Sequence, residues 1–223
     1  MITSEYNLPL FTDINTLSGN DVLFHESIAR KNGFKYIAGV DEVGRGPLAG
    51  PVVAAAIILA KDTELEGVKD SKQMSERARA RAFPKIYEKA LSVSIGVVSN
   101  RSIDRINILN ASLEAMKKAV MSLDPAPDFI LVDGIHKIPI GISQKCIKKG
   151  DQLSLSIAAA SVFAKVYRDR IMKAYHDMFP EYGLSRNKGY GTAEHREALK
   201  LHGPSFIHRL SFGGVCSNDE RKT

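Results

Sequence analysis

The sequence contains no tryptophan and only two cysteines, Cys146 and Cys216, which lie far apart in the chain. Neither cysteine belongs to a C-x-x-C or Cys/His pattern, so the sequence offers no zinc ligand set and no disulfide framework. No apolar run approaches the roughly twenty residues that cross a bilayer. The N-terminal stretch also lacks the basic start and apolar core of a signal peptide. These absences predict a cytoplasmic protein with reduced thiols and no membrane contact.

The composition is that of a folded protein with a basic surface. Hydrophobic residues make up 44% of the 223 residues, which is enough for a full core and excludes global disorder. The length suits one large domain, or one ordinary domain with appendages. The formal net charge of +6 favours a polyanionic partner such as a nucleic acid, although charge alone is weak support for one.

The most informative stretch runs from residue 36 to residue 59. Residues 36–40 have the β-branched and aromatic side chains of a strand, and residues 52–59 form an unbroken apolar run typical of a strand buried on both faces. Between them stand Asp41 and Glu42, followed by a glycine-rich bend at 44–46. Adjacent carboxylates at the end of a buried strand repel each other and lose hydration, and a bound cation would offset both costs.

Two other interpretations of this stretch compete with a metal site. Residues 44–49 formally fit the G-x-G-x-x-A dinucleotide fingerprint, with Asp62 or Glu64 roughly twenty residues further on. That fingerprint must open a helix, whereas Pro51 and the apolar run after it predict a strand. A plain hairpin with solvated acids remains open on this stretch alone.

The predicted elements follow the order β-β-α-β-α-β-β-α, which indicates an α/β fold with a mixed sheet flanked by helices. Ser75 has the side chain of a helix N-cap. We expect a short helix that Asp21 caps and that runs through Ala29. Strands are expected at 36–40, 52–59, 91–99 and 128–133, and helices at 75–89, 152–173 and 193–201. One more helix carries the apolar stripe Ile106, Leu109, Leu113, Met116 and Val120.

Carboxylates stand at the ends of three separate apolar segments. They are Asp41 with Glu42, Asp133 and Asp151. If the strands that end at Val40 and Val132 lie side by side, their acids meet, and Asp151 at the start of the next helix completes the group. Oxygen donors without histidine or cysteine suit Mg²⁺ or Mn²⁺, and two such ions support in-line attack on a phosphodiester. Taken singly, Asp133 could be a turn former and Asp151 a helix cap.

Six motifs extend this pattern over residues 35 to 212. In chain order they are DEVGRGPLAGPVVAAA at 41–56, DSKQMSERAR at 70–79, ILVDG at 130–134, KGDQLSLSIAAASVFAKVYRDRIM at 149–172, YGLSRNKGYGTAEH at 182–195 and HRLSF at 208–212. In this combination and order they resemble ribonuclease HII, a type 2 ribonuclease H. The related ribonuclease HIII family usually has glutamate at the fourth acidic position and a larger N-terminal domain, so Asp151 and the short leader favour HII.

The resemblance implies a ribonuclease H-like fold with a small helical C-terminal subdomain. We therefore expect an N-terminal arm with a short helix at 1–34, a catalytic domain at 35–175, and a C-terminal helical subdomain with a tail at 176–223. It also implies that Asp41, Glu42, Asp133 and Asp151 are the catalytic carboxylates that bind the metal ions. The role of the N-terminal arm stays open.

The resemblance also implies a substrate. Family members hydrolyse the RNA strand of RNA–DNA hybrids and nick duplex DNA on the 5′ side of a single embedded ribonucleotide, leaving 5′-phosphate and 3′-hydroxyl ends. Gly44 and Gly46 would let the backbone approach a ribose closely, because they have no Cβ. The 2′-hydroxyl is the group that distinguishes RNA there. Arg45 would contact an adjacent phosphate.

The resemblance implies further substrate contacts, and the sequence supports some of them better than others. Tyr190 matches the family tyrosine that packs on the sugar at the RNA–DNA junction, although a half-buried structural tyrosine is the simpler alternative. Lys72, Arg186 and Lys188 are candidate phosphate contacts, and a solvated surface role is nearly as probable for each. His208 and Arg209 lie in a family motif that leaves packing and phosphate binding equally open.

Two alternatives to this function remain on the sequence alone. One is a ribonuclease H-like nuclease that acts on DNA only, and the other is a non-catalytic nucleic-acid-binding module with structural acids. The side-chain types do not discriminate Mg²⁺ from Mn²⁺. We expect a monomer, the default for a single cleft that grips a duplex, and the sequence gives no signal for a protein partner.

Overall fold

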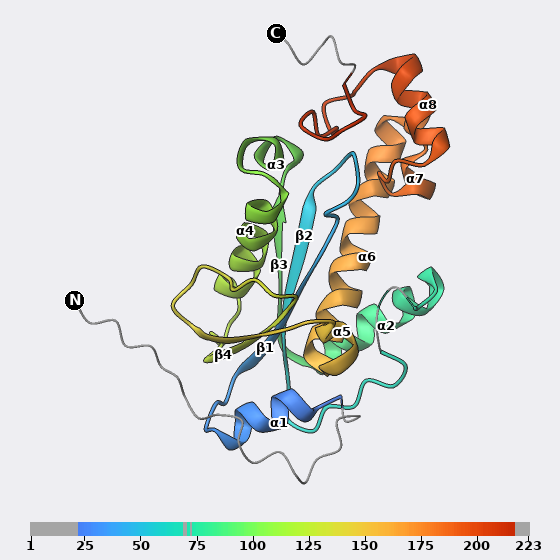
Figure 1. The fold of residues 1–223 in the computed structure, drawn as a ribbon. Coiled ribbons are helices and arrows are strands. Elements are labelled where there is room, and N and C mark those ends of the chain that lie inside the picture. The colour runs from blue at the N-terminus through green and yellow to red at the C-terminus, as the bar shows by residue number, and fades with distance from the viewer. Residues whose placement is uncertain (1–21, 69–70, 72, 217–223) are drawn as a thin grey trace, which may run out of the picture.

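The centre of the molecule is a five-stranded mixed sheet with the strand order β3-β2-β1-β4-β5 (Figure 1). The computed structural model describes residues 22–68, 71 and 73–216. β1 pairs antiparallel with β2 and parallel with β4, β2 pairs antiparallel with β3, and β4 pairs parallel with β5. The strands are β1 (Ile37–Val43), β2 (Val52–Leu59), β3 (Ala90–Val98), β4 (Phe129–Asp133) and β5 (Ser143–Ile147).

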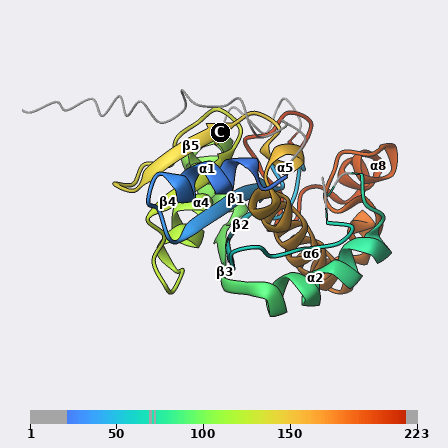
Figure 2. The same ribbon diagram turned by 90° about the horizontal axis from the view of Figure 1, so that it is seen from below.

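Helices cover both faces of this sheet (Figures 1 and 2). One face packs against α4, and the other packs against α6 with α2 beside it. The helices are α1 (Phe24–Lys31), α2 (Glu76–Lys89), α3 (Asn100–Ile106), α4 (Ile108–Met121), α5 (Gly150–Leu153), α6 (Leu155–Met178), the 3-10 turn η1 (Pro180–Tyr182), α7 (Leu184–Asn187) and α8 (Ala193–His202). Of the helices in the described part of the chain, none has both the length and the apolar character that crossing a membrane requires.

The sequence patterns explain most of these elements. All eight residues of β2 are buried, as expected for a strand covered on both faces, and they alternate between the α4 side and the α6 side. Ser75 caps α2, since its side chain accepts a hydrogen bond from the N–H of Ala78. The predicted mixed sheet and the strand at 128–133 are confirmed.

The boundaries of β1 and of two predicted helices differ from expectation. β1 runs on to Val43 because its pairing with β2 continues past the acids, so Asp41 and Glu42 lie inside the strand. The expected helix carrying Ile106 is broken at Asn107, whose φ of 64° is outside the helical region, and its side chain caps α4. A second break at Ser154 divides the predicted helix at 152–173 into α5 and α6. Asp21, the predicted cap of α1, lies outside the described residues.

A separate apolar cluster holds the C-terminal elements together. It joins residues of η1, α7 and α8 to Met172 of α6 and to Leu48 and Ala49, which follow β1. Backbone contacts tie the same parts together, because Ala49 forms an isolated bridge with His208 and the N–H of Leu48 donates to the carbonyl of Gly189. The C-terminal region therefore packs directly on the connection between β1 and β2.

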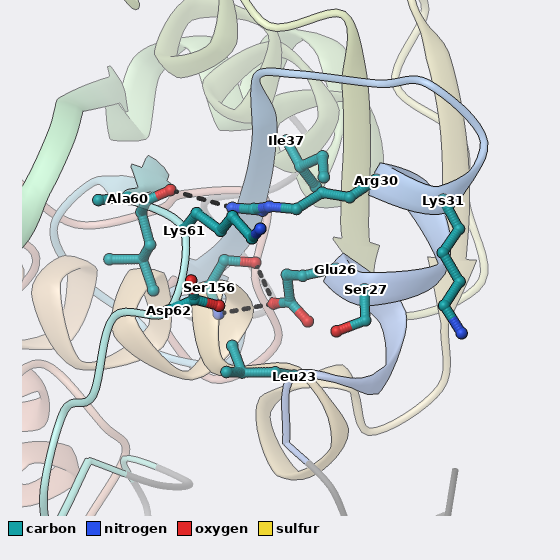
Figure 3. Close-up of a pocket in the computed structure, with 11 residues that line it drawn as sticks. Leu23, Glu26, Ser27, Arg30, Lys31, Ile37, Ala60, Lys61, Asp62 and Ser156 are labelled. Carbon is teal, nitrogen blue, oxygen red and sulfur yellow. Dashed lines mark hydrogen bonds between the residues drawn. The ribbon is translucent and has the colours of Figure 1, made fainter. Parts of the chain in front are cut away.

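At the other end of the sheet, Glu26 fastens α1 to the start of α6 (Figure 3). One oxygen of this buried carboxylate accepts hydrogen bonds from the Ser154 hydroxyl at 2.7 Å, and from the hydroxyl and the N–H of Ser156 at 2.6 and 3.0 Å. A carboxylate at a helix N-terminus is favoured by the helix dipole. Glu26 also lines a cavity of about 350 Å³ between α1 and the end of β2.

Glu26→Ala should therefore destabilise the protein by about 1.5–3 kcal/mol, because it removes hydrogen bonds to a charged acceptor. Urea denaturation measures the change, with Lys31→Ala on the exposed side of α1 as the matched control. A Glu26→Ala protein as stable as the control would show that the contact does not anchor α1.

Candidate active site

The parallel pairing of β1 and β4 brings the predicted acids together. Val40 lies opposite Val132 in the register, so Asp41 and Asp133 occupy the next position on two neighbouring strands. This is the juxtaposition that the sequence predicts for the strands ending at these valines. Two carboxylates that are far apart in the chain thus lie on neighbouring strands at equivalent positions.

Asp41 points from β1 towards α6. Gly39, two residues earlier on the same face, is so close to α6 that a Cβ there would lie 2.2 Å from the Ser156 carbonyl carbon. Ser161, just over one helical turn beyond Ser156, is close enough to Asp41 for its hydroxyl to lower the pKa of this carboxyl. The Ser161 hydroxyl is also 2.8 Å from the hydroxyl of Ser71, in the 70–79 motif. No sequence pattern indicates this serine contact, because it depends on how closely the helix approaches the strand.

Glu42 faces a different part of the site. It lines a cavity of about 270 Å³ together with Arg45, Asp133 and His136, and α4 supplies much of the apolar wall. Arg45 forms an ion pair with Glu42, with 3.3 Å between Nη1 and Oε1. His136 is exposed and was not among the residues predicted from the sequence.

Asp151 is placed near Asp133 by the turn that starts α5. Oδ1 of Asp133 accepts a hydrogen bond from the N–H of Gly150 at 2.7 Å, and Asp151 is the next residue. Asp151 is buried. A Cβ at position 150 would lie 2.6 Å from Cδ1 of Ile157, so a larger residue there would have to displace the end of the Ile157 side chain.

Burial and like charge make the ionised acids costly in this site. Burial, followed by the charges of Glu42 and Asp133, raises the pKa of Asp41 well above its usual value, and the Ser161 hydroxyl only partly opposes this. Burial also raises the pKa of Glu42, against the attraction of Arg45, while the charge of Asp133 raises it further. These are the conditions under which carboxylates gain most from a bound cation.

The donor set fits a hard divalent cation, because every candidate ligand is a carboxylate and two have raised pKa values. As the side chains stand, however, the described residues include no group of three or more histidine, cysteine or acidic side chains that could hold a metal ion. The acids are neighbours that a cation would have to draw together.

The glycine-rich connection between β1 and β2, residues 44–51, is called the glycine loop below. It is followed by a strand rather than a helix, so the dinucleotide-binding interpretation is wrong. Gly44 has a φ of +96°, and a Cβ there would lie 2.3 Å from Nε of Arg168. Arg45 and Gly46 are exposed. The β1–β2 pair is indeed a hairpin, but Asp41 is buried rather than solvated.

Arg209 is fully buried behind the glycine loop, so it packs inside the protein rather than on its surface. Its guanidinium donates to the carbonyl oxygens of Gly44, Arg45 and Gly50 at 2.6–3.0 Å. Burial, followed by the charge of Arg168, lowers the pKa of Arg209 to about 9, which leaves it cationic at neutral pH. The structure thus decides between the two roles that the sequence left open.

Tyr190 lies beside the glycine loop. A Cβ at Gly46 would be 3.6 Å from Cε1 of Tyr190, and the tyrosine is exposed. Residues 188–191, called the tyrosine loop below, are joined to the glycine loop through Arg168, which donates to Lys188 O at 2.9 Å and to Ala49 O at 3.1 Å. Gly46 and Tyr190, predicted from separate motifs, are therefore neighbours.

The three candidate phosphate contacts differ in their surroundings. Arg186 is exposed and forms an ion pair with Glu194. The ammonium of Lys188 donates to the carbonyl of Ser185 at 2.6 Å, and lies 3.8 Å from Glu76. Lys72 lies outside the described residues. The existing partners of Arg186 and Lys188 are on the protein itself, so these side chains would have to exchange them for phosphate.

Two buried histidines, His195 and His208, connect by hydrogen bonds to the backbone of the tyrosine loop. The N–H of Ser205 donates to Nδ1 of His208, so the proton of the neutral ring is on Nε2. This Nε2 is 3.0 Å from Nε2 of His195, whose Nδ1 lies 2.9 Å from the carbonyl oxygen of Tyr190. The chain of hydrogen bonds is complete only when both rings are neutral, which matches the directions of their pKa shifts. Burial lowers the pKa of His208 to about 4 and also lowers that of His195.

Comparison with known proteins identifies the family. The Ribonuclease HII family model matches residues 38–215. The Ribonuclease HII of Geobacter metallireducens is 52% identical over 208 residues, which cover 93% of this chain and 96% of that protein. This chain belongs to the ribonuclease HII family. It is therefore an endonuclease that hydrolyses the RNA strand of RNA–DNA hybrids.

Solved structures agree with this assignment to the ribonuclease HII family. The ribonuclease H2 of Pyrococcus horikoshii OT3 has a TM-score of 0.71 at 27% identity, covering 84% of this chain and 98% of that one. A Bst-RNase HIII structure in complex with Mn²⁺ has a TM-score of 0.65 at 24% identity, covering 84% of this chain and 70% of that one, and supports the fold alone. The predicted ribonuclease H-like fold is confirmed.

The neutral histidine pair makes stability depend on pH. Between pH 6.5 and about 4 the unfolded chain binds a proton at position 208 that the folded protein does not, so stability should fall as the pH falls through this range. His208→Gln removes this titration. The difference in unfolding free energy between the wild type and His208→Gln, measured in urea at several pH values, should therefore shrink towards pH 4. Parallel curves would contradict the pKa assigned to His208.

Proposed function

We propose that this protein nicks duplex DNA on the 5′ side of a single embedded ribonucleotide, leaving 5′-phosphate and 3′-hydroxyl ends, in addition to cutting longer hybrids. Such an activity would serve ribonucleotide removal during DNA replication and repair. The observation that carries the proposal is the placement of Asp41 and Asp133 side by side, next to the glycine loop, whose Gly46 is a neighbour of Tyr190 on the tyrosine loop. Acids that cut a phosphodiester and groups that can recognise one sugar thus belong to one region.

The roles of the acids follow from their chemistry. Asp41, Glu42, Asp133 and Asp151 would hold one or two Mg²⁺ or Mn²⁺ ions, which supply charge stabilisation to the attacking and leaving oxygens of an in-line displacement. The Ser161 hydroxyl would keep the Asp41 carboxylate directed into the site. Gly150 would do the same for Asp133 through its N–H. These contacts would limit the side-chain freedom that Asp41 and Asp133 lose when a cation draws the acids together.

Selection of a ribonucleotide is assigned to the exposed part of the glycine loop. Gly46 has no Cβ, so the backbone can reach the 2′-hydroxyl of a sugar that stacks against Tyr190. Arg45 would contact a neighbouring phosphate, with Lys72, Arg186 and Lys188 as further phosphate contacts. The protein would act as a monomer, since one chain supplies all of these groups.

Asp41→Asn and Asp133→Asn should each reduce cleavage of a mono-ribonucleotide duplex by at least about a thousandfold, the scale expected for removing charge that stabilises the transition state. Asp41→Asn should unfold at the same or a higher temperature than the wild type, because it removes a buried carboxyl that is repelled by its neighbours. Single-turnover rates and thermal melts measure the two effects. Full turnover by either variant at saturating Mg²⁺ would exclude the assigned site.

The decisive experiment maps the cleavage sites on three labelled duplexes of one sequence: all-DNA, DNA with one ribonucleotide, and an RNA–DNA hybrid. We expect scission of the second on the 5′ side of the ribonucleotide and of the third along the RNA strand, both abolished by a chelator. Scission of the all-DNA duplex would indicate a DNA nuclease instead. Binding without scission in Mg²⁺ and in Mn²⁺ would indicate a non-catalytic module.

A further inference from the structure

The carbonyl groups of the glycine loop are turned into the protein. The guanidinium of Arg209 donates hydrogen bonds to the carbonyl oxygens of Gly44, Arg45 and Gly50. Arg168 donates from Nη2 to the carbonyl oxygen of Ala49 at 3.1 Å and from Nε to that of Pro51 at 3.0 Å. Five carbonyl oxygens of one short loop therefore face two buried guanidinium groups. The dipoles of these carbonyl groups solvate the two cations.

This arrangement fixes the direction of the opposite ends of the same peptide groups. In a trans peptide the C=O of one residue and the N–H of the next point in opposite directions. Since Gly44 O and Arg45 O point to Arg209, the N–H groups of Arg45 and Gly46 point away from it, on the exposed side of the loop. Within the part of the chain that the structure describes, neither N–H donates a hydrogen bond to the protein.

An arginine can hold several backbone carbonyl groups in fixed directions, whereas a lysine cannot. The planar fork of Arg209 reaches three carbonyl oxygens at once, two of them on successive peptide groups. A lysine ammonium is a single point of charge and would satisfy fewer of them in a fixed geometry. Fully buried, the Arg209 side chain has no path to a phosphate, so it acts on substrate only through the loop.

We propose that Arg209 is a positioning residue for ribonucleotide selection: by holding the carbonyls of Gly44 and Arg45, it directs the N–H groups of Arg45 and Gly46 towards the 2′-hydroxyl and the adjacent phosphate of the bound strand. The inference rests on the proposed function, because it concerns recognition of the same sugar. Arg168 fixes the position of the tyrosine loop beside the glycine loop, since it donates hydrogen bonds to both loops.

The test compares binding of two duplexes that differ by one 2′-hydroxyl. Dissociation constants for the mono-ribonucleotide duplex and its all-DNA counterpart are measured by fluorescence anisotropy in EDTA, so that no strand is cut. The proteins are the wild type, Arg209→Lys and the control Arg81→Lys, which replaces an exposed arginine on α2. Thermal melts of all three report the folded fraction.

Positioning and a merely structural role give different results. If Arg209 positions the loop, Arg209→Lys keeps the all-DNA affinity within about twofold and loses about tenfold of the preference for the ribonucleotide duplex, the discrimination of one well-made hydrogen bond. Arg81→Lys keeps both. Equal weakening of both duplexes, or an unchanged preference, would overturn the inference. No preference in the wild type itself would instead show that the proposed ribonucleotide recognition is wrong.

A measurement on the wild type covers the case in which Arg209→Lys does not fold. Amide chemical shifts of Arg45 and Gly46 are followed in ¹⁵N-labelled protein during titration with each duplex. The inference expects larger changes at these two amides with the ribonucleotide duplex than with the all-DNA duplex. Equal changes with both duplexes would reject it without any variant.

Discussion

The parallel pairing of β1 with β4 is the constraint on which the site depends. It sets Val40 opposite Val132 and so places two carboxylates, the buried Asp41 and the partly buried Asp133, side by side. Burial, followed by the charges of Glu42 and Asp133, raises the pKa of Asp41, so ionising this carboxyl costs free energy in the folded protein. The eight fully buried residues of β2 on the other side of β1 supply the apolar packing that offsets this cost.

Helix α6 links the acids to the loops that surround them. Its first turns lie against Gly39 and place Ser161 on Asp41, while Arg168, about two turns further on, holds both the glycine loop and the tyrosine loop. The helix is fastened at its start by Glu26 on α1 (Figure 3). A single rigid element therefore sets the distance between the acids and the loops, and a shift of α6 along β1 would move all of these contacts together.

Sequence reasoning found the parts of the site that have a pattern of their own. Apolar runs that end in acids predicted the meeting of Asp41 and Asp133, and the order of the motifs predicted the family. It did not find Ser161, whose contact with Asp41 depends on how closely α6 approaches β1. It also missed Arg168 and left the role of Arg209 open, because a buried arginine that donates to backbone carbonyls has no periodicity or spacing. The helix break at Asn107 was missed for a related reason, since one residue with positive φ ends a helix without disturbing the apolar stripe.

The acids of the candidate site and the buried arginines occupy different parts of the region. The acids of the candidate site lie at the end of the sheet, whereas the two buried arginines lie behind the glycine loop, with their charge spread over backbone carbonyls. An arginine on the surface would attract any phosphate and would lose much of its effect to screening by salt. Buried behind the loop, the same charge instead orders peptide groups, and ordered N–H groups respond to the position of a hydroxyl as well as to charge. The proposed selection of one sugar within a polyanion needs that second property.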